Sequence, residues 1–75
     1  MKAFKGWVNI SGTNYRYEGR QYSRKSKYGI EGGKIKQLTI KCKGKVVTSY
    51  DKAWVIKPST FQQIDAFDII MYDYN

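Results

Sequence analysis

Apolar and polar residues alternate with a period of two along the first part of the chain, which is typical of a β-strand with one buried face. One face carries Phe4, Gly6, Val8 and Ile10, and the other carries Lys5, Trp7, Asn9 and Ser11. Gly12-Thr13 suits a tight turn with glycine at its first central position. Residues 14–22 then alternate again, with Tyr15 and Tyr17 on one side. The pattern predicts a β-hairpin.

Two further strands are predicted after a basic, glycine-rich segment at residues 23–38. Leu38, Ile40 and Cys42 form the inner face of the third strand, and the residues between them point outward. Lys43-Gly44 is a turn signal. Residues 46–50 after this turn predict a fourth strand.

A helix is predicted at the C-terminal end of the chain. Pro58 interrupts the strand pattern, and the segment from Ser59 to Gln62 has capping-box spacing, with Ser59 capping the first turn and Gln62 reaching back. The helix should run from about Thr60 to Tyr74. At about 100° per residue, one broad face should pack on the sheet. This face contains Ile64, Ala66, Phe67, Ile70, Met71 and Tyr74.

These elements predict an α+β fold in the order ββββα. The four-stranded sheet should be mainly antiparallel, with the single C-terminal helix packed on one face. The 75 residues should form one small basic domain, residues 1–75, in which most large apolar side chains are needed for the core. Because one helix covers only one face, the other face of the sheet should meet solvent.

Charge is distributed unevenly along the chain. All 14 lysines and arginines lie in residues 1–57 together with three acids, whereas residues 58–75 contain three aspartates and no cation. The net charge is +8. An excess of this size on a small body attracts polyanions such as nucleic acid or an acidic protein surface.

The solvent-facing side of the predicted sheet is the first candidate site. Cations alternate there with an aromatic side chain, a combination that suits single-stranded nucleic acid, whose bases stack on rings while its phosphates contact cations. The candidate residues are Lys5, Trp7, Arg16, Arg20, Lys41 and Lys43. The alternative is an ordinary polar sheet face, on which Arg16, Glu18 and Arg20 form weak cross-strand pairs.

The basic segment SRKSKYGIEGGKIKQL, residues 23–38, does not match the common phosphate-binding loops. A Walker loop requires glycine where this chain has Tyr28 and serine or threonine where it has Ile35, and it precedes a helix instead of a strand. The GxxG spacing of residues 29–32 lies between strands and includes Glu31, an acid that repels phosphate.

A turn is the simpler interpretation of this segment. Gly32-Gly33 would supply positive φ angles, while Tyr28 and Ile30 anchor the loop to the core. Anion binding by the loop stays open as an alternative. The cations available for it are Arg24, Lys25, Lys27 and Lys34.

The outer face of the predicted helix is a second candidate site, for a protein partner. Apolar side chains are mixed there with acids, outside the face that should pack on the sheet. The residues are Phe61, Asp65, Asp68, Ile69 and Tyr72. The alternative is that Phe61 folds down at the helix start and the others are ordinary exposed residues.

The sequence indicates no catalytic, metal or cofactor site. The chain has no histidine, and its one cysteine, Cys42, has neither a disulfide partner nor an activating neighbour and should face the core. Asp65 and Asp68 share a helix face, but two solvated carboxylates make a poor metal site. We therefore expect a protein that is not an enzyme.

Three segments, YGIEGGKIKQLTI (residues 28–40), YDKAW (residues 50–54) and the closing YN (residues 74–75), resemble a family of short uncharacterised proteins of Gram-positive bacteria, their phages and integrative elements. The resemblance names no activity and no functional residues. It implies an origin in a mobile element, and small proteins of such origin often bind host machinery, including nucleoprotein defence complexes.

The N-terminal residues MKAFKGWVNI lack the apolar run of a signal peptide, and no segment approaches the length of a membrane span. We therefore expect a cytoplasmic protein of a bacterial host, without a membrane partner. Two functions are open: a binder of nucleic acid or nucleoprotein that uses the basic sheet face, and a protein interaction module that uses the helix face or the basic face. The second class includes inhibitors of a host defence complex such as a CRISPR-type effector.

Overall fold

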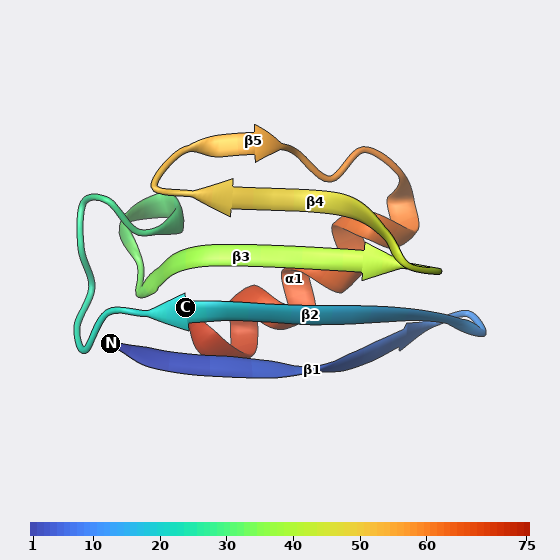
Figure 1. Ribbon diagram of the computed structural model, residues 1–75, viewed down its shortest axis with the longest axis horizontal. Coiled ribbons are helices and arrows are strands. Elements are labelled where there is room, and N and C mark those ends of the chain that lie inside the picture. The colour runs from blue at the N-terminus through green and yellow to red at the C-terminus, as the bar shows by residue number, and fades with distance from the viewer.

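The computed structural model describes all 75 residues and contains five strands, a short 3₁₀ helix and one α-helix (Figure 1). The elements, in chain order, are β1 (Lys2–Ile10), β2 (Thr13–Gln21), η1 (Ile30–Gly32), β3 (Ile35–Cys42), β4 (Lys45–Asp51), β5 (Trp54–Ile56) and α1 (Phe61–Tyr74). No helix is both long enough and apolar enough to cross a bilayer.

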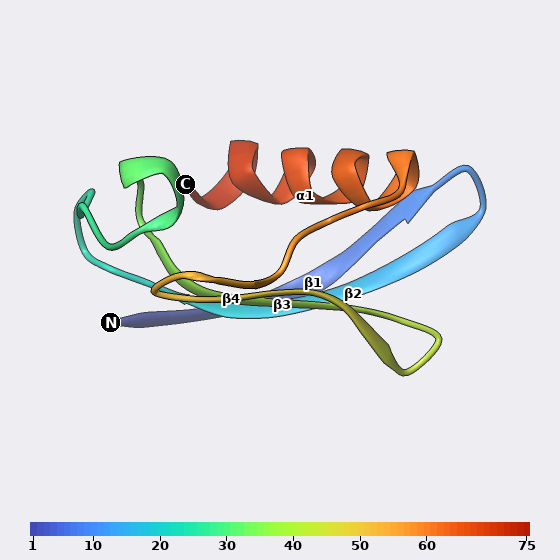
Figure 2. The same cartoon turned by 90° about the horizontal axis from the view of Figure 1, so that it is seen from above.

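The strands form one antiparallel sheet in the order β1-β2-β3-β4-β5, and α1 lies across one of its faces (Figures 1 and 2). Each strand therefore pairs with the next one along the chain. The predicted α+β class and the single C-terminal helix are confirmed. The predicted number of four strands is wrong, because β5 adds a fifth at the edge beyond β4.

Strand β5 is short, which is why the sequence pattern did not reveal it. It contains three residues and pairs with β4 through Ser49 opposite Ile56 and Tyr50 opposite Trp54. Three residues are too few to establish an alternation. The turn before it places Lys52 at a φ of 61°, a left-handed conformation that sequence does not suggest for lysine.

The two hairpin turns at one end of the sheet both use consecutive left-handed residues. Ser11 and Gly12 have φ angles of 50° and 85° and connect the paired residues Ile10 and Thr13, so the predicted turn at Gly12-Thr13 is wrong by one position. Lys43-Gly44 forms the predicted turn, with φ angles of 53° and 79°. Two positive φ angles give the backbone twist that matches antiparallel strands.

The helix begins one residue later than the capping pattern predicted. Thr60, not Ser59, is the N-cap: its hydroxyl accepts from the backbone N–H of Gln63 at 3.1 Å, and the Gln63 side chain accepts from the Thr60 N–H at 3.3 Å. Gln62 instead accepts a hydrogen bond from the Tyr15 hydroxyl at 3.0 Å. This contact with the sheet occupies the side chain that the predicted cap required.

The core lies between α1 and the covered face of the sheet. Its buried residues are Phe4, Val8, Tyr15, Tyr17, Ile30, Ile35, Leu38, Ile40, Tyr50, Ala66, Phe67 and Ile70. Met71, Tyr74 and Cys42 pack against it while partly exposed. The predicted packing face of the helix is confirmed except for Ile64, which is 39% exposed because it lies at the margin of the helix–sheet contact.

The side chain of Asn75 links the loop between β2 and β3 to the first residue of β3. The Asn75 side chain donates to the carbonyl of Ile30 and accepts from the N–H of Ile35, both at 2.9 Å. Gly33 packs directly against this side chain, so that a Cβ at this position would collide with it. The Asn75 amide therefore joins η1, the start of β3 and the end of α1.

The predicted role of the loop residues is only partly correct. Positive φ angles occur at Glu31 (52°) and Gly32 (71°), whereas Gly33 has a φ of −95° and is glycine for lack of space. Ile30 anchors the loop in the core as predicted. The side chain of Tyr28 is 55% exposed instead, and this residue contributes its carbonyl, which accepts from the Tyr50 hydroxyl at 3.1 Å.

Candidate nucleic-acid interface

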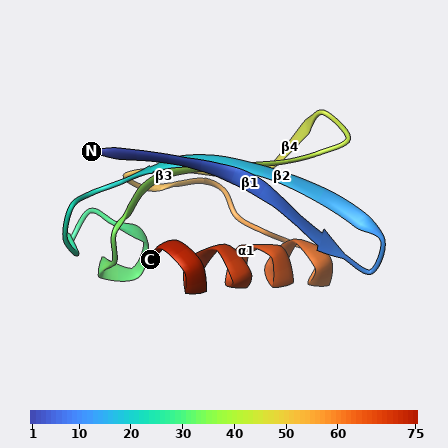
Figure 3. The ribbon, with the colours of Figure 1, turned by 90° about the horizontal axis from the view of Figure 1, so that it is seen from below.

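The face of the sheet opposite α1 is not covered by any other element (Figures 2 and 3). We call it the open face. The cross-strand register of β1, β2 and β3 arranges its side chains in three rows. These rows are Trp7–Arg16–Lys41, Lys5–Glu18–Thr39 and Ala3–Arg20–Gln37.

A hollow of about 590 Å³ lies at the end of the open face that carries the two hairpin turns. The Trp7 indole is 66% exposed at this hollow, and the Arg16 guanidinium carbon lies 5.8 Å from the centre of its ring. Lys41 and Lys43 complete the cationic lining. The turn between β3 and β4, which contains Lys43, bends away from the helix, so it rises above the open face (Figures 2 and 3). We call the hollow beside Trp7 the tryptophan hollow.

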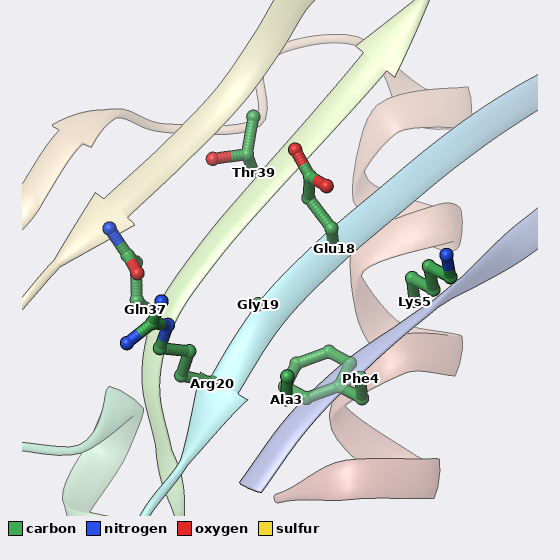
Figure 4. A pocket seen from close by; sticks show the side chains of 8 residues that line it. All are labelled: Ala3, Phe4, Lys5, Glu18, Gly19, Arg20, Gln37 and Thr39. Atoms are coloured by element: carbon green, nitrogen blue, oxygen red, sulfur yellow. The ribbon is translucent and has the colours of Figure 1, made fainter. Parts of the chain in front are cut away.

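A second hollow of about 530 Å³ lies over the other two rows, and we call it the Glu18 hollow. It is lined by Ala3, Phe4, Lys5, Glu18, Gly19, Arg20, Gln37 and Thr39 (Figure 4). Figure 4 shows Glu18 and Thr39 on one side of Gly19, and Arg20 with Gln37 on the other. This hollow therefore differs from the tryptophan hollow in containing a carboxylate, with Lys5 opposite it on β1 and Arg20 on the other side of Gly19.

The residues predicted for nucleic-acid binding fall into three groups. The tryptophan hollow brings together Trp7, Arg16, Lys41 and Lys43, while Lys5 and Arg20 line the Glu18 hollow. The exposed loop cations lie elsewhere: they are Arg24, Lys25, Lys27 and Lys34. The loop between β2 and β3 curls toward the helix side at the opposite end of the sheet (Figures 1 and 2). The loop and the tryptophan hollow are thus separate surfaces.

Glu18, Gln37 and Thr39 are candidate functional residues that sequence reasoning did not select. Alternation already placed all three on the outer face, but their proximity depends on the pairing of β2 with β3, which places Glu18 opposite Thr39 and Arg20 opposite Gln37. The signal available in the sequence was Glu18 itself, an acid with arginines two residues away on either side.

The residues predicted for a protein partner do share the outer face of α1. Phe61 and Tyr72 are 89% and 91% exposed, Ile69 is 43% exposed, and Asp65 and Asp68 are also exposed. The alternative in which Phe61 folds down at the helix start is therefore wrong. This surface therefore combines exposed aromatic rings with negative charge, whereas the tryptophan hollow combines an exposed ring with positive charge.

Two further titratable groups, the phenols of Tyr15 and Tyr17, lie in the core. Burial, with a hydrogen bond to the Tyr74 hydroxyl at 3.0 Å, raises the pKa of Tyr17 to about 12, and burial also raises the pKa of Tyr15. Both phenols therefore stay protonated at neutral pH. No three histidine, cysteine, aspartate or glutamate side chains come together in a cluster that could hold a metal ion.

A family model described as "Domain of unknown function (DUF7678)" matches residues 2–75, nearly the whole chain. The description of this family names no activity. No curated protein and no solved structure matches the chain.

Proposed function

We propose that this chain, which belongs to the family of the domain of unknown function DUF7678, is a non-enzymatic binding module that holds single-stranded nucleic acid, free or within a nucleoprotein, on its open face. The observation that carries the proposal is the exposed Trp7 indole at a hollow lined by Arg16, Lys41 and Lys43. The volume of this hollow, about 590 Å³, lies within the usual range of small-ligand sites.

Stacking and charge act together at this place. A base that stacks on an aromatic ring gains about 1–3 kcal/mol, and the gain depends little on the identity of the base. Arg16 lies near the indole, and Lys41 is the next residue in the same row, so cations adjoin the position of the stacked base. They would contact the phosphates on either side of that base.

The biological setting is part of the same proposal. The resemblance of residues 28–40, 50–54 and 74–75 to proteins of Gram-positive bacteria, their phages and integrative elements supports an origin in a mobile element. We place the protein in the bacterial cytoplasm, where single-stranded nucleic acid and nucleoproteins of the host are its candidate targets.

The salt dependence of binding tests the proposal. A short single-stranded oligonucleotide, titrated from about 50 to about 200 mM salt, should bind with a slope of log K against log salt of about −3, because four or five cations contact phosphates. Trp7→Ala should weaken binding by about 1–3 kcal/mol. Tyr72→Ala, which removes an even more exposed ring from the helix, should bind like the parent.

Two variants with the same loss of charge distinguish the open face from the loop. One replaces Lys5, Arg16, Lys41 and Lys43 with glutamine, and the other replaces Arg24, Lys25, Lys27 and Lys34. The face variant should lose most of the salt dependence, whereas the loop variant should bind somewhat more slowly but retain a steep slope. Loss of binding only in the loop variant would transfer the site to the loop. Absence of binding at the lowest salt would end the nucleic-acid proposal.

A second candidate function is supported by the outer face of α1. Phe61 and Tyr72 are almost fully exposed there, beside Asp65 and Asp68. Large exposed aromatic side chains are enriched at protein interfaces, where they act as anchors. We propose, as the alternative, a protein partner for this surface, such as a subunit of a host defence complex that the protein inhibits.

Replacing Ile69 and Tyr72 together with lysine tests this alternative. The double variant should fold, since both side chains are exposed, but should lose a specific protein that the parent retains from host lysate after nuclease treatment and a high-salt wash. Asp73→Lys, an exposed change on the same helix outside the candidate set, is the control. Equal retention by the parent and the double variant would exclude the helix face.

A further inference from the structure

We propose that the Glu18 hollow selects guanine, so that the open face prefers single strands in which a guanine is flanked by a base stacked on Trp7. The inference rests on the proposed function, because it assigns a base to the second hollow of the same surface. It concerns Glu18, Arg20 and Gln37, which line that hollow.

Glu18 lies among cations on the open face, where its negative charge opposes phosphate binding. Its strand neighbours on the open face are Arg16 and Arg20, and the residue opposite it on β1 is Lys5. A carboxylate at this position repels a phosphate and reduces the attraction of three cations for it. A carboxylate is also an acceptor without a donor, so it suits the N–H groups on the edge of a base. Reading a base is therefore a role that this position serves better than holding the backbone.

Guanine matches the arrangement of donors and acceptors around the hollow. Its Watson–Crick edge presents the N1–H and N2–H₂ donors, which a carboxylate can accept together, and its O6 and N7 are adjacent acceptors on the next edge. The carboxylate of Glu18 lies on one side of Gly19, and the donors of Arg20 and Gln37 lie on the other (Figure 4). Arginine bound to O6 and N7 is the commonest specific contact to guanine.

The other bases fit less well. Cytosine and adenine each offer one amino donor beside a ring nitrogen acceptor, and this acceptor would face the carboxylate. Thymine and uracil place their single N–H between two carbonyl oxygens, both of which Glu18 would repel. The expected order of preference therefore begins with guanine and ends with thymine or uracil.

The two hollows are close enough for neighbouring nucleotides. Glu18 follows Arg16 by two residues on β2, and Arg16 pairs with Trp7, so the row of Glu18 lies about 6.6–6.8 Å from the row of Trp7 along the strand, and the row of Arg20 lies about twice as far. One repeat of an extended sugar–phosphate chain covers a comparable distance. A smaller hollow lined by Arg16, Glu18, Thr39 and Lys41 lies between them.

Four oligonucleotides of about seven nucleotides test the selection. The reference contains thymine only, and the others carry one central guanine, inosine or 7-deazaguanine. The guanine oligonucleotide should bind about tenfold more tightly than the reference. Inosine lacks the N2 amino group and 7-deazaguanine lacks N7, so each should lose part of this preference. Equal binding of the guanine and thymine oligonucleotides overturns the inference while the proposed function stands, whereas no binding of any of the four at low salt overturns both.

Glu18→Gln separates base reading from a general charge effect. The variant should bind the thymine reference more tightly than the parent does, because an acid has been removed, yet its preference for guanine should fall to less than about twofold. Asp73→Asn makes the same change in net charge at an exposed position of the helix and should keep the full preference. The contrary result is a Glu18→Gln variant that binds all four oligonucleotides more tightly by the same factor, with the preference for guanine intact. Glu18 would then only lower the positive charge of the open face, and the inference would be overturned.

Discussion

Replacing Ile70 with alanine is expected to lower the free energy of unfolding by about 3 kcal/mol. The Ile70 side chain is completely buried between α1 and the sheet, so its removal loses transfer free energy and leaves a cavity. Chemical denaturation of the parent and the variant, followed by far-ultraviolet circular dichroism, measures the difference as a shift of the midpoint. A loss of this size is a large part of the stability of a small domain.

The preceding residue provides a matched control. Ile69 is chemically identical but 43% exposed, and Ile69→Ala should cost less than about 1 kcal/mol. The comparison tests which face of the helix packs on the sheet. Equal losses for the two variants, or a larger loss for Ile69→Ala, would contradict the orientation of α1 in which Ile70 faces the sheet and Ile69 faces solvent.

Alkaline pH is expected to destabilise the fold through Tyr17. Burial and the hydrogen bond to Tyr74 raise the pKa of Tyr17 to about 12, compared with an ordinary value of about 10 in the unfolded chain. Between these values the unfolded chain releases the proton while the folded protein keeps it, so stability falls as pH rises. The loss should reach about 2–3 kcal/mol near pH 12. Burial also raises the pKa of Tyr15, which adds a loss of the same sign.

Tyr17→Phe isolates this contribution. The variant loses the hydrogen bond to Tyr74 and should be less stable than the parent at neutral pH by about 1 kcal/mol. At high pH the variant should lose less stability than the parent, because residue 17 no longer has a proton to release. Urea denaturation at a series of pH values should show the parent losing more stability than the variant above about pH 10, whereas Tyr72→Phe should follow the parent. Parallel curves for the parent and Tyr17→Phe would contradict the assignment.

The long elements could be predicted from sequence because their local patterns agree with the tertiary structure. Along β1, alternation correctly separated Phe4 and Val8 in the core from Lys5 and Trp7 on the open face. Helical periodicity likewise placed Ala66, Phe67 and Ile70 inside and Phe61 and Tyr72 outside. In these segments a single periodicity, repeated over several residues, decides whether a side chain faces the core or solvent.

Features that are too short to show a periodicity, or that depend on a distant segment, were missed or shifted. The N-cap of α1 is Thr60 instead of Ser59, and Gln62, the predicted partner in the cap, instead accepts a hydrogen bond from Tyr15 of β2. Strand β5 has only three residues, too few to establish an alternation. The role of Asn75 is a third case: its partners, Ile30 and Ile35, are 45 and 40 residues away along the chain. No local pattern contains this information.

The sequence by itself determined the chemistry available to the open face, namely cations, one acid and an exposed indole on alternating positions of predicted strands. Only the tertiary structure decided how they are grouped. The register of β1, β2 and β3 joins Trp7 to Arg16 and Lys41 in one hollow, sets Glu18 in another, and leaves the loop cations at the opposite end of the sheet. Alternation specifies which face a side chain occupies, but its neighbours on that face come from strand pairing, which is set by the turns and by the core on the other side.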